Sequence, residues 1–124
     1  MNSQIFYFVV IGTIGVSIDY IIYTFILNFL SIDISKTLGF VSGALFNFFM
    51  NRKITFSVSD VVERRLLKFF LLYCLTLYLN VTINKVAANF FISNTFNIQI
   101  AFILATSVST VINFIGQKFW VFKK

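Results

Sequence analysis

The stretch NFFMNRKITF, residues 47–56, sets two adjacent cations, Arg52 and Lys53, inside an otherwise apolar and aromatic run. Near the other end of the chain, residues 113–122 read NFIGQKFWVF. This second stretch repeats the first Asn, the Phe after it and the final Phe, with Gln in place of the second Asn and Lys in place of Arg. The two stretches lie 66 residues apart. The second copy indicates that the cations belong to a repeated sequence motif.

The composition is that of a membrane protein. Of the 124 residues, 59% are hydrophobic and 18 are Phe, and the mean hydropathy is +0.92. Charged residues make up only 11%, which is too few to cover the surface of a small soluble globule. No linker rich in Pro, Gly or Ser divides the chain, so we expect one membrane domain over residues 1–124. The single cysteine, Cys74, lies in an apolar stretch and is expected to pack there.

Four apolar segments are long enough to cross a bilayer as helices, since a helix rises about 1.5 Å per residue and the hydrocarbon core is about 30 Å thick. They are approximately residues 5–30, 34–54, 67–92 and 98–122. Short connections within the first and last pairs predict two hairpins. The predicted fold is therefore an all-α integral membrane protein of four transmembrane helices, arranged as two parallel two-helix repeats. Chance similarity between apolar segments of low complexity is the alternative explanation of the repeat.

The distribution of cations predicts an orientation. Eight of the ten Lys and Arg residues lie in the central connection or near the C-terminus. Because positive charge in short loops marks the cytoplasmic side, we expect a multi-pass protein of the cell (cytoplasmic or inner) membrane with both termini cytoplasmic. The polar segment 57–68 predicts a short amphipathic helix along the headgroups, with Arg64, Arg65 and Lys68 facing lipid phosphates. Anionic lipid then accounts for the +6 net charge without a nucleic-acid partner.

Polar residues within the apolar segments are costly unless paired, so they are expected to face the interior of the bundle. Stripes appear at helical spacing on all four spans: Thr106, Thr110, Asn113 and Gln117 on the fourth, Lys36, Gly39, Gly43, Asn47 and Asn51 on the second, Tyr73, Thr76, Asn80 and Asn84 on the third, and Thr13, Ser17, Tyr20 and Thr24 on the first. The two glycines favour close helix packing. The four amides, Asn47, Asn51, Asn113 and Gln117, fit hydrogen bonding between helices and contact with a ligand equally well.

Two charged residues are expected deep in the membrane. Measured along the parallel first and third spans, Asp19 and Lys85 lie at a similar depth, and an ion pair would let both remain charged. This predicted intramembrane polar pair has three interpretations: it fixes the helices, Lys85 and Asp19 reach separately to the outer interface, or the pair lines the path of a polar headgroup.

Arg52 and Lys118 occupy equivalent places in the two decapeptides, each directly after a striped amide. Anchoring at the membrane edge explains one such cation. Two cations beside amides at one face also make an anion site, since Arg grips phosphate through paired hydrogen bonds. We therefore predict a lipid-phosphate and sugar site comprising Asn47, Asn51, Arg52, Asn113, Gln117 and Lys118. Lys53 keeps the ordinary anchoring role.

Nothing in the sequence predicts an enzyme. The chain has no His, no pair of Cys residues, no glycine-rich phosphate loop and no two carboxylates on one helix face. We predict no catalytic residue, no metal site and no cofactor.

Several of these features resemble the GtrA-like family of small four-span membrane proteins: an aromatic start F-x-x-V/I-G (Phe8 to Gly12), the acidic Asp19, N-F-x-x-N-R-x-x-T-F closing the second span and its near-copy closing the fourth. The chain departs from this pattern at Ile54, where Trp often stands, and at Gln117 and Lys118. The resemblance implies that the protein moves a polyprenyl-phosphate-linked monosaccharide from the cytoplasmic to the outer leaflet for modification of cell-envelope polysaccharide. It also implies a glycosyltransferase partner, and contact of Asn47, Asn51, Arg52, Asn113 and Lys118 with the lipid phosphate and first sugar. The small size of the chain favours a homo-oligomer.

Two other functions remain open. The protein would in one case be a non-transporting membrane anchor or partner subunit of a polyprenyl-phosphate glycosyltransferase. In the other it would be a small proton-coupled exporter with Asp19 as the proton carrier.

Overall fold

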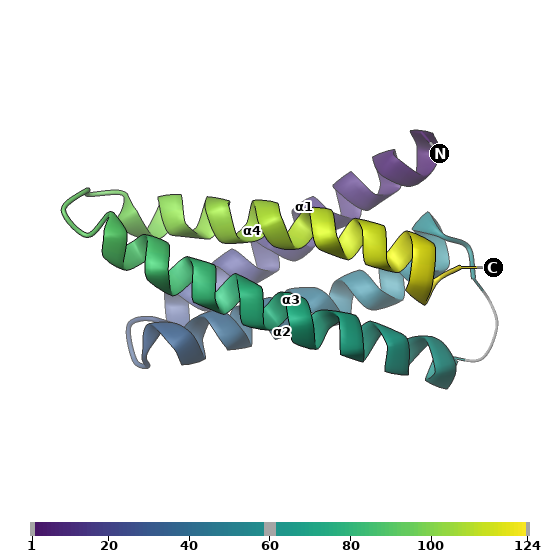
Figure 1. Ribbon diagram of the computed structural model, residues 1–124, viewed down its shortest axis with the longest axis horizontal. Helices are drawn as coiled ribbons and strands as arrows, with labels where there is room; N and C mark the ends of the chain where they lie inside the picture. The colour runs from purple at the N-terminus through teal and green to yellow at the C-terminus, as the bar shows by residue number, and fades with distance from the viewer. Residues whose placement is uncertain (1, 59–61, 124) are drawn as a thin grey trace.

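Four long helices run antiparallel to their chain neighbours in the computed structural model, which describes residues 2–58 and 62–123 (Figure 1). They are α1 (Asn2–Ile26), α2 (Ile32–Met50), α3 (Val62–Phe90) and α4 (Asn97–Gly116). Two five-residue π-helical segments, η1 (Asn51–Thr55) and η2 (Gln117–Val121), continue α2 and α4. No strand occurs within the described ranges, so the prediction of an all-α protein is confirmed.

Three helical stretches are long and apolar enough to cross a membrane: Asn2–Ile26, Arg64–Phe90 and Asn97–Val121. The fourth long helix, α2, has 19 residues and packs along α1. Its first turns carry Asp33 and Lys36, which reduce its apolar character. The segment 57–68 does not form the separate amphipathic helix predicted above, because α3 begins at Val62 and continues without a break to Phe90. Residues 59–61 of that segment, including Asp60, lie outside the described residues.

The helix ends are fixed by local hydrogen bonds. Ser31 caps α2, its side chain accepting from the backbone N–H of Ile34. In the turn before α4, the Asn94 side chain accepts from the backbone N–H of Phe96 at 2.8 Å, and Asn97 Nδ2 donates to the Ala88 carbonyl at 3.0 Å. These contacts close the two hairpins at the same end of the bundle, opposite the two chain termini (Figure 1).

Glycines allow α1 and α2 to touch through their backbones. A Cβ atom at Gly43 would lie 2.6 Å from the carbonyl oxygen of Gly15, and one at Gly39 would lie 2.6 Å from that of Asp19. Such distances are too short for any side chain, so these positions require glycine. The packing interpretation of Gly39 and Gly43 is confirmed.

The molecule is apolar outside and polar inside. Large side chains such as Phe6, Phe25 and Tyr78 are more than 60% exposed on the outer surface. The buried polar and charged residues are Asp19, Ser35, Lys36, Asn51, Thr55, Arg65, Thr76, Asn80, Asn84, Ser109, Asn113 and Gln117. This distribution suits a hydrocarbon surrounding, where exposed backbone and side-chain polar groups are costly.

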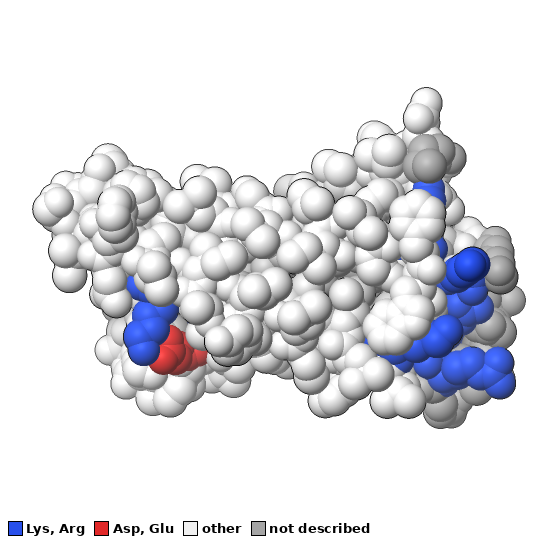
Figure 2. Space-filling view, in the orientation of Figure 1, with Lys and Arg blue, Asp and Glu red and all other residues white. Residues whose placement is uncertain are grey.

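Positive charge gathers at one end of the bundle. Figure 2 shows Lys and Arg side chains over the end that holds both termini and the α2–α3 connection. At the other end, Lys85 lies beside Asp33. Lys124, one of the cations counted in the sequence, lies outside the described residues. We refer to the two ends as the basic end and the hairpin end.

Candidate functional site: a polar cavity between the helices

A cavity of about 40 Å³ lies between the four helices and is lined by residues of the predicted stripes, of which Thr110 is exposed at the surface. Asn47 of α2 and Asn113 of α4, which hold equivalent places in the two decapeptides, both line it. Asp19 of α1 and Asn80 of α3 complete the polar wall. The volume suits about three water molecules at roughly 10–15 Å³ each. It is far below the several hundred Å³ of an ordinary ligand pocket, so the helices must separate before the cavity can hold a sugar.

The cavity wall is rich in hydrogen-bond acceptors. Five of its side-chain oxygens are buried and have no hydrogen-bond partner among the described residues: Asp19 Oδ1, Asn47 Oδ1, Asn80 Oδ1, Thr106 Oγ1 and Asn113 Oδ1. An unpaired polar atom in a helical interior costs free energy, which a hydroxyl or water donor in the cavity would offset. The carboxylate oxygen of Asp19 among them repels an anion. This wall therefore suits hydroxyl groups and does not suit a phosphate.

A hydrogen-bond chain closes the cavity towards the basic end. Thr55 Oγ1 donates to Asn51 Oδ1 at 2.8 Å, and Asn51 Nδ2 donates to Gln117 Oε1 at 3.0 Å. Gln117 Nε2 then donates to the hydroxyl of Tyr73 at 2.9 Å, and Tyr73 lines the cavity. Of the four predicted site amides, Asn51 and Gln117 thus join helices, whereas Asn47 and Asn113 line the cavity and each has a buried side-chain oxygen without a hydrogen-bond partner among the described residues.

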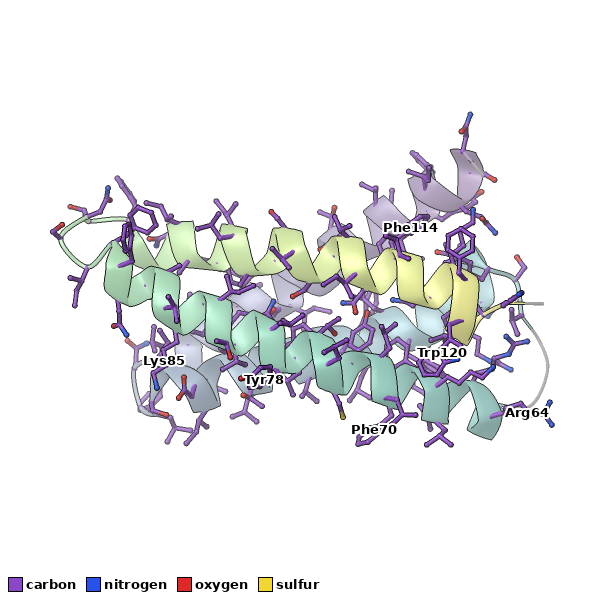
Figure 3. The ribbon with its side chains drawn as sticks, viewed as in Figure 1. Arg64, Phe70, Tyr78, Lys85, Phe114 and Trp120 are labelled. Atoms are coloured by element: carbon purple, nitrogen blue, oxygen red, sulfur yellow. The ribbon has the colours of Figure 1, made fainter. Side chains whose placement is uncertain are left out.

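The two decapeptides adopt the same backbone geometry and meet each other. Each changes to a π-helix at its second amide, with Phe56 N–H donating to Asn51 O at 2.9 Å and Phe122 N–H donating to Gln117 O at 2.8 Å. The rings of Phe56 and Phe122 stack at 5.2 Å, and both side chains are buried. These two rings therefore belong to the core and not to an interfacial aromatic belt. Trp120, which is 42% exposed, lies at the basic end (Figure 3).

Arg52 and Lys118 each follow the first residue of a π-helical segment at the basic end. Both are half-buried. Lys118 Nζ donates to Gln4 Oε1 at 3.0 Å, and it lies 5.9 Å from the ring centre of Phe114. The two predicted phosphate ligands thus stand at the same end of the bundle, beyond the hydrogen-bond chain that closes the cavity.

The predicted ion pair between Asp19 and Lys85 is wrong. Asp19 Oδ2 instead accepts from Lys36 Nζ at 2.6 Å, and Lys36 is completely buried. Lys85 pairs with Asp33 at 3.0 Å near the hairpin end, where both side chains are about half exposed (Figure 3).

The error came from comparing depths along the two parallel helices α1 and α3. Within the antiparallel first hairpin, Asp19 lies two turns before the end of α1, and Lys36 lies about one turn after the start of α2. This places the two residues opposite each other. The ring centres of Tyr23, Phe40 and Phe102 lie 4.8–5.7 Å from Lys36 Nζ, so aromatic faces surround the buried cation.

A match to a protein-family model identifies the family of the chain. The family model described as GtrA/DPMS, transmembrane domain, matches residues 7–122. The chain belongs to the GtrA/DPMS transmembrane family. Membership confirms the resemblance found in the sequence, and it connects this multi-pass membrane protein with the handling of polyprenyl-phosphate sugars. GtrA-like proteins are generally non-catalytic. No solved structure matches the chain.

One of the three cations expected to face lipid headgroups has another role in this GtrA/DPMS protein. Arg65 is 8% exposed, and its Nη1 donates to the carbonyl oxygens of Val121 and Lys123 at 2.8 and 2.7 Å. It satisfies carbonyl groups at the end of η2, which a helix terminus otherwise leaves without partners. Arg64 is exposed at the start of α3 (Figure 3), and Lys68 is half-buried one turn later.

The predicted site omitted three residues that the interior of this GtrA/DPMS fold uses. Tyr73 joins the hydrogen-bond chain to the cavity. Asn80 Nδ2 donates to Ser109 Oγ at 2.9 Å, and Asn84 Nδ2 donates to Tyr23 Oη at 3.1 Å. These three residues belong to the stripe that the sequence shows on the third span, but they were not assigned to the site.

Proposed function

We propose that the protein translocates a polyprenyl-phosphate-linked monosaccharide from the cytoplasmic to the outer leaflet of the cell membrane, for modification of cell-envelope polysaccharide. The observation that carries this proposal is the cavity with five unpartnered oxygens inside a bundle whose outer surface is apolar. A merely structural bundle gains nothing from buried acceptors without partners. A carrier of hydroxyl groups through hydrocarbon requires them.

The phosphate and the sugar bind to different parts of this site. The hydroxyl groups of the sugar donate to Asn47 and Asn113 in the cavity. Before transfer, the phosphate lies with Arg52 and Lys118 at the basic end, because the carboxylate oxygen of Asp19 in the cavity wall repels it. Asn51 and Gln117 form the barrier between these two parts.

The arrangement of the helices follows from the same proposal. The two hairpins are parallel repeats, and their pseudo-twofold axis passes between Asn51 and Gln117 and between Phe56 and Phe122, the equivalent residues that touch each other. All four helices cross the membrane, α2 included. The basic end faces the cytoplasm, which places both termini there. Arg64 and Lys68 face anionic lipid, and the cations gathered at the basic end offer a membrane-associated glycosyltransferase a basic surface.

The cavity is too small for a sugar in this conformation, which matches a resting state of such a carrier. The bonds among Asn51, Gln117 and Tyr73 close the side towards the basic end. The buried pair of Asp19 and Lys36 closes the side towards the hairpin end. Passage of a sugar requires the hairpins to separate at each closure in turn. In a homo-oligomer, neighbouring copies of the chain surround the moving hairpins.

The test is the sidedness of a labelled polyprenyl-phosphate sugar in vesicles that contain only this protein. A membrane-impermeant periodate probe oxidises only sugars on the outer face, so translocation makes the protected fraction accessible over time. Asn47→Leu and Asn113→Leu should each slow transfer roughly 2- to 10-fold, the equivalent of about 0.5–1.5 kcal/mol for one hydrogen bond. Asn89→Leu is the matched control, because Asn89 is exposed on the surface of α3.

Protected sugar that stays protected in vesicles with the wild-type protein would refute translocation. The second candidate, a non-transporting anchor or partner of a glycosyltransferase, would then be favoured, and the small volume of the cavity is the observation that supports it. The ion pair of Asp19 with Lys36 disfavours the proton-coupled exporter, since a carboxylate held at 2.6 Å from an ammonium group is not a lone proton carrier.

A further inference from the structure

An apolar groove runs along the seam between α2 and α3 on the outside of the bundle. Its volume is about 270 Å³, and nearly all of its surface is apolar. Val41 and Leu45 of α2 form one bank, and Phe70, Cys74 and Leu77 of α3 form the other. Leu45 is 54% exposed and Phe70 is 61% exposed, so the groove opens sideways to the surrounding hydrocarbon (Figure 3).

The groove and the polar cavity share a wall. Phe40, Ala44 and Tyr73 line both of them. Tyr73 presents its hydroxyl group to Gln117 and stacks its ring on that of Phe69, which also lines the groove, at 4.0 Å. Because Ala44 has only a methyl group at this wall, the partition is thin. A site for hydroxyl groups and a site for an apolar chain therefore lie directly side by side.

The hollow seam continues towards the hairpin end. A second hollow of about 420 Å³ shares Cys74 and Leu77 with the first and reaches Asp33 and Thr82. From Leu66 to Thr82 the lining covers roughly 24 Å of α3 at about 1.5 Å per residue, close to the thickness of the hydrocarbon core. An apolar chain in this seam remains in contact with the protein over most of the membrane.

We propose that the α2–α3 groove binds the isoprenoid chain of the substrate next to its phosphate, while the sugar occupies the polar cavity behind Ala44 and Tyr73. This inference rests on the proposed function, because the shared wall has a purpose only for an amphiphile whose polar and apolar parts are joined. The groove has room for the first few isoprene units, and the rest of the chain lies in the bilayer.

Shape, and not the hydrophobic effect, gives this groove its selectivity. A chain that leaves lipid for the groove exchanges one apolar surrounding for another, so the gain is in packing contacts. The aromatic walls of Phe40, Phe69 and Phe70 are rigid. They suit the fixed double bonds and methyl branches of an isoprenoid better than a flexible, unbranched acyl chain.

The experiment uses polyprenyl phosphate with a diazirine in its second isoprene unit and the full chain in phosphatidylglycerol nanodiscs. After illumination, labelled residues are located by peptide mass spectrometry. We expect labels on groove residues of α2 and α3. Cys74→Trp fills the groove and should abolish these labels, as should Val41→Trp from the opposite bank, which covers the case that the first variant does not fold. Unlabelled polyprenol without phosphate should compete with the probe.

The matched control is Val111→Trp. Cys74 lies roughly 15 Å along α3 from Arg64, and Val111 lies about the same distance from Val121 on the antiparallel α4. Val111 is 59% exposed and lies outside the groove. The Val111→Trp variant should be labelled as strongly as the wild type.

Three results would overturn the groove assignment. The first is labelling of α1 and α4 as strong as that of α2 and α3. The second is failure of unlabelled polyprenol to displace the label in the phosphatidylglycerol nanodiscs, which would make the groove an ordinary lipid contact. The third is a groove without label in which Cys74→Trp converts a dimer to a monomer, which would make it an interface between copies. Groove labelling together with failure of the vesicle assay would refute translocation alone.

Discussion

The buried ion pair between Asp19 and Lys36 gives the sharpest prediction about stability, because the chain also contains an exposed pair of the same chemistry. Lys36 is 0% exposed, whereas the side chains of Lys85 and Asp33 are 52% and 45% exposed. Removing one member of a buried pair typically costs about 3–5 kcal/mol, since the other charge is left in a poorly polarisable interior. An exposed pair is worth about 0–1 kcal/mol.

Lys36→Met should therefore lower the free energy of unfolding by about 3 kcal/mol or more, and Lys85→Met by less than about 1 kcal/mol. Asp19→Asn should lower the free energy of unfolding more than Lys36→Met does. It leaves the ammonium group of Lys36 buried among aromatic rings, whereas Lys36→Met leaves the Asp19 carboxylate at the border of a polar cavity. The double variant Asp19→Asn/Lys36→Met should be more stable than the sum of its single changes predicts. The coupling energy should reach about 2–3 kcal/mol.

Unfolding is measured by titration with sodium dodecyl sulfate in mixed micelles, followed through the fluorescence of Trp120, the single tryptophan. Asp19→Asn/Lys85→Met serves as the control cycle and should be additive, since these residues pair with other partners. Equal losses for Lys36→Met and Lys85→Met would refute the reasoning. So would additive effects of Asp19→Asn and Lys36→Met.

Three further predictions concern helix contact, the closure of the cavity and the basic end. Gly43→Ala should destabilise the protein by about 1–3 kcal/mol in the same titration, because the added Cβ meets the Gly15 carbonyl. Gly12→Ala is the control and should be tolerated, because nothing lies within 4 Å of a Cβ at this position. Asn51→Leu should lower stability by about 1 kcal/mol for the lost bond to Gln117, and an unchanged unfolding midpoint would refute this closure. Arg52→Ala and Lys118→Ala should leave membrane insertion intact but slow transfer in the vesicle assay at least about tenfold, as the loss of one charge-assisted hydrogen bond of about 1.5–3 kcal/mol implies. Lys53→Ala is their control, and normal transfer by both variants would end the phosphate assignment.

The sequence predicted the helices well because their signal is local. Length and apolar character locate α1, α3 and α4, and the Gly39–Gly43 spacing indicated a close helix contact that the structure contains. The π-helical turns were beyond this reasoning, since a change in backbone hydrogen bonding leaves no periodic pattern in ten residues. The decapeptides nevertheless marked both places where the change occurs.

Partners distant in sequence were harder to predict. Asp19 was assigned to Lys85 because depth alone does not choose between neighbouring helices, and only the antiparallel register of α1 and α2 identifies Lys36. Arg65 was expected to face lipid headgroups, yet its side chain donates to backbone carbonyl groups of the C-terminal segment. For the four amides, spacing indicated an interior position but did not distinguish Asn51, which joins helices, from Asn47, which faces the cavity.

The hydrogen bond between Asn51 and Gln117 gives a direction to the series of side-chain hydrogen bonds in the interior. Two identical residues facing each other across a twofold axis must donate and accept alike, so no direction could be preferred. Here the equivalent residues differ by one methylene, and every donor in the series from Thr55 through Asn51 and Gln117 to Tyr73 points the same way. Tyr73, at the end of this series, lines the cavity. Joining two hairpins in one chain thus permits an oriented row of dipoles that a symmetric pair of separate hairpins could not form.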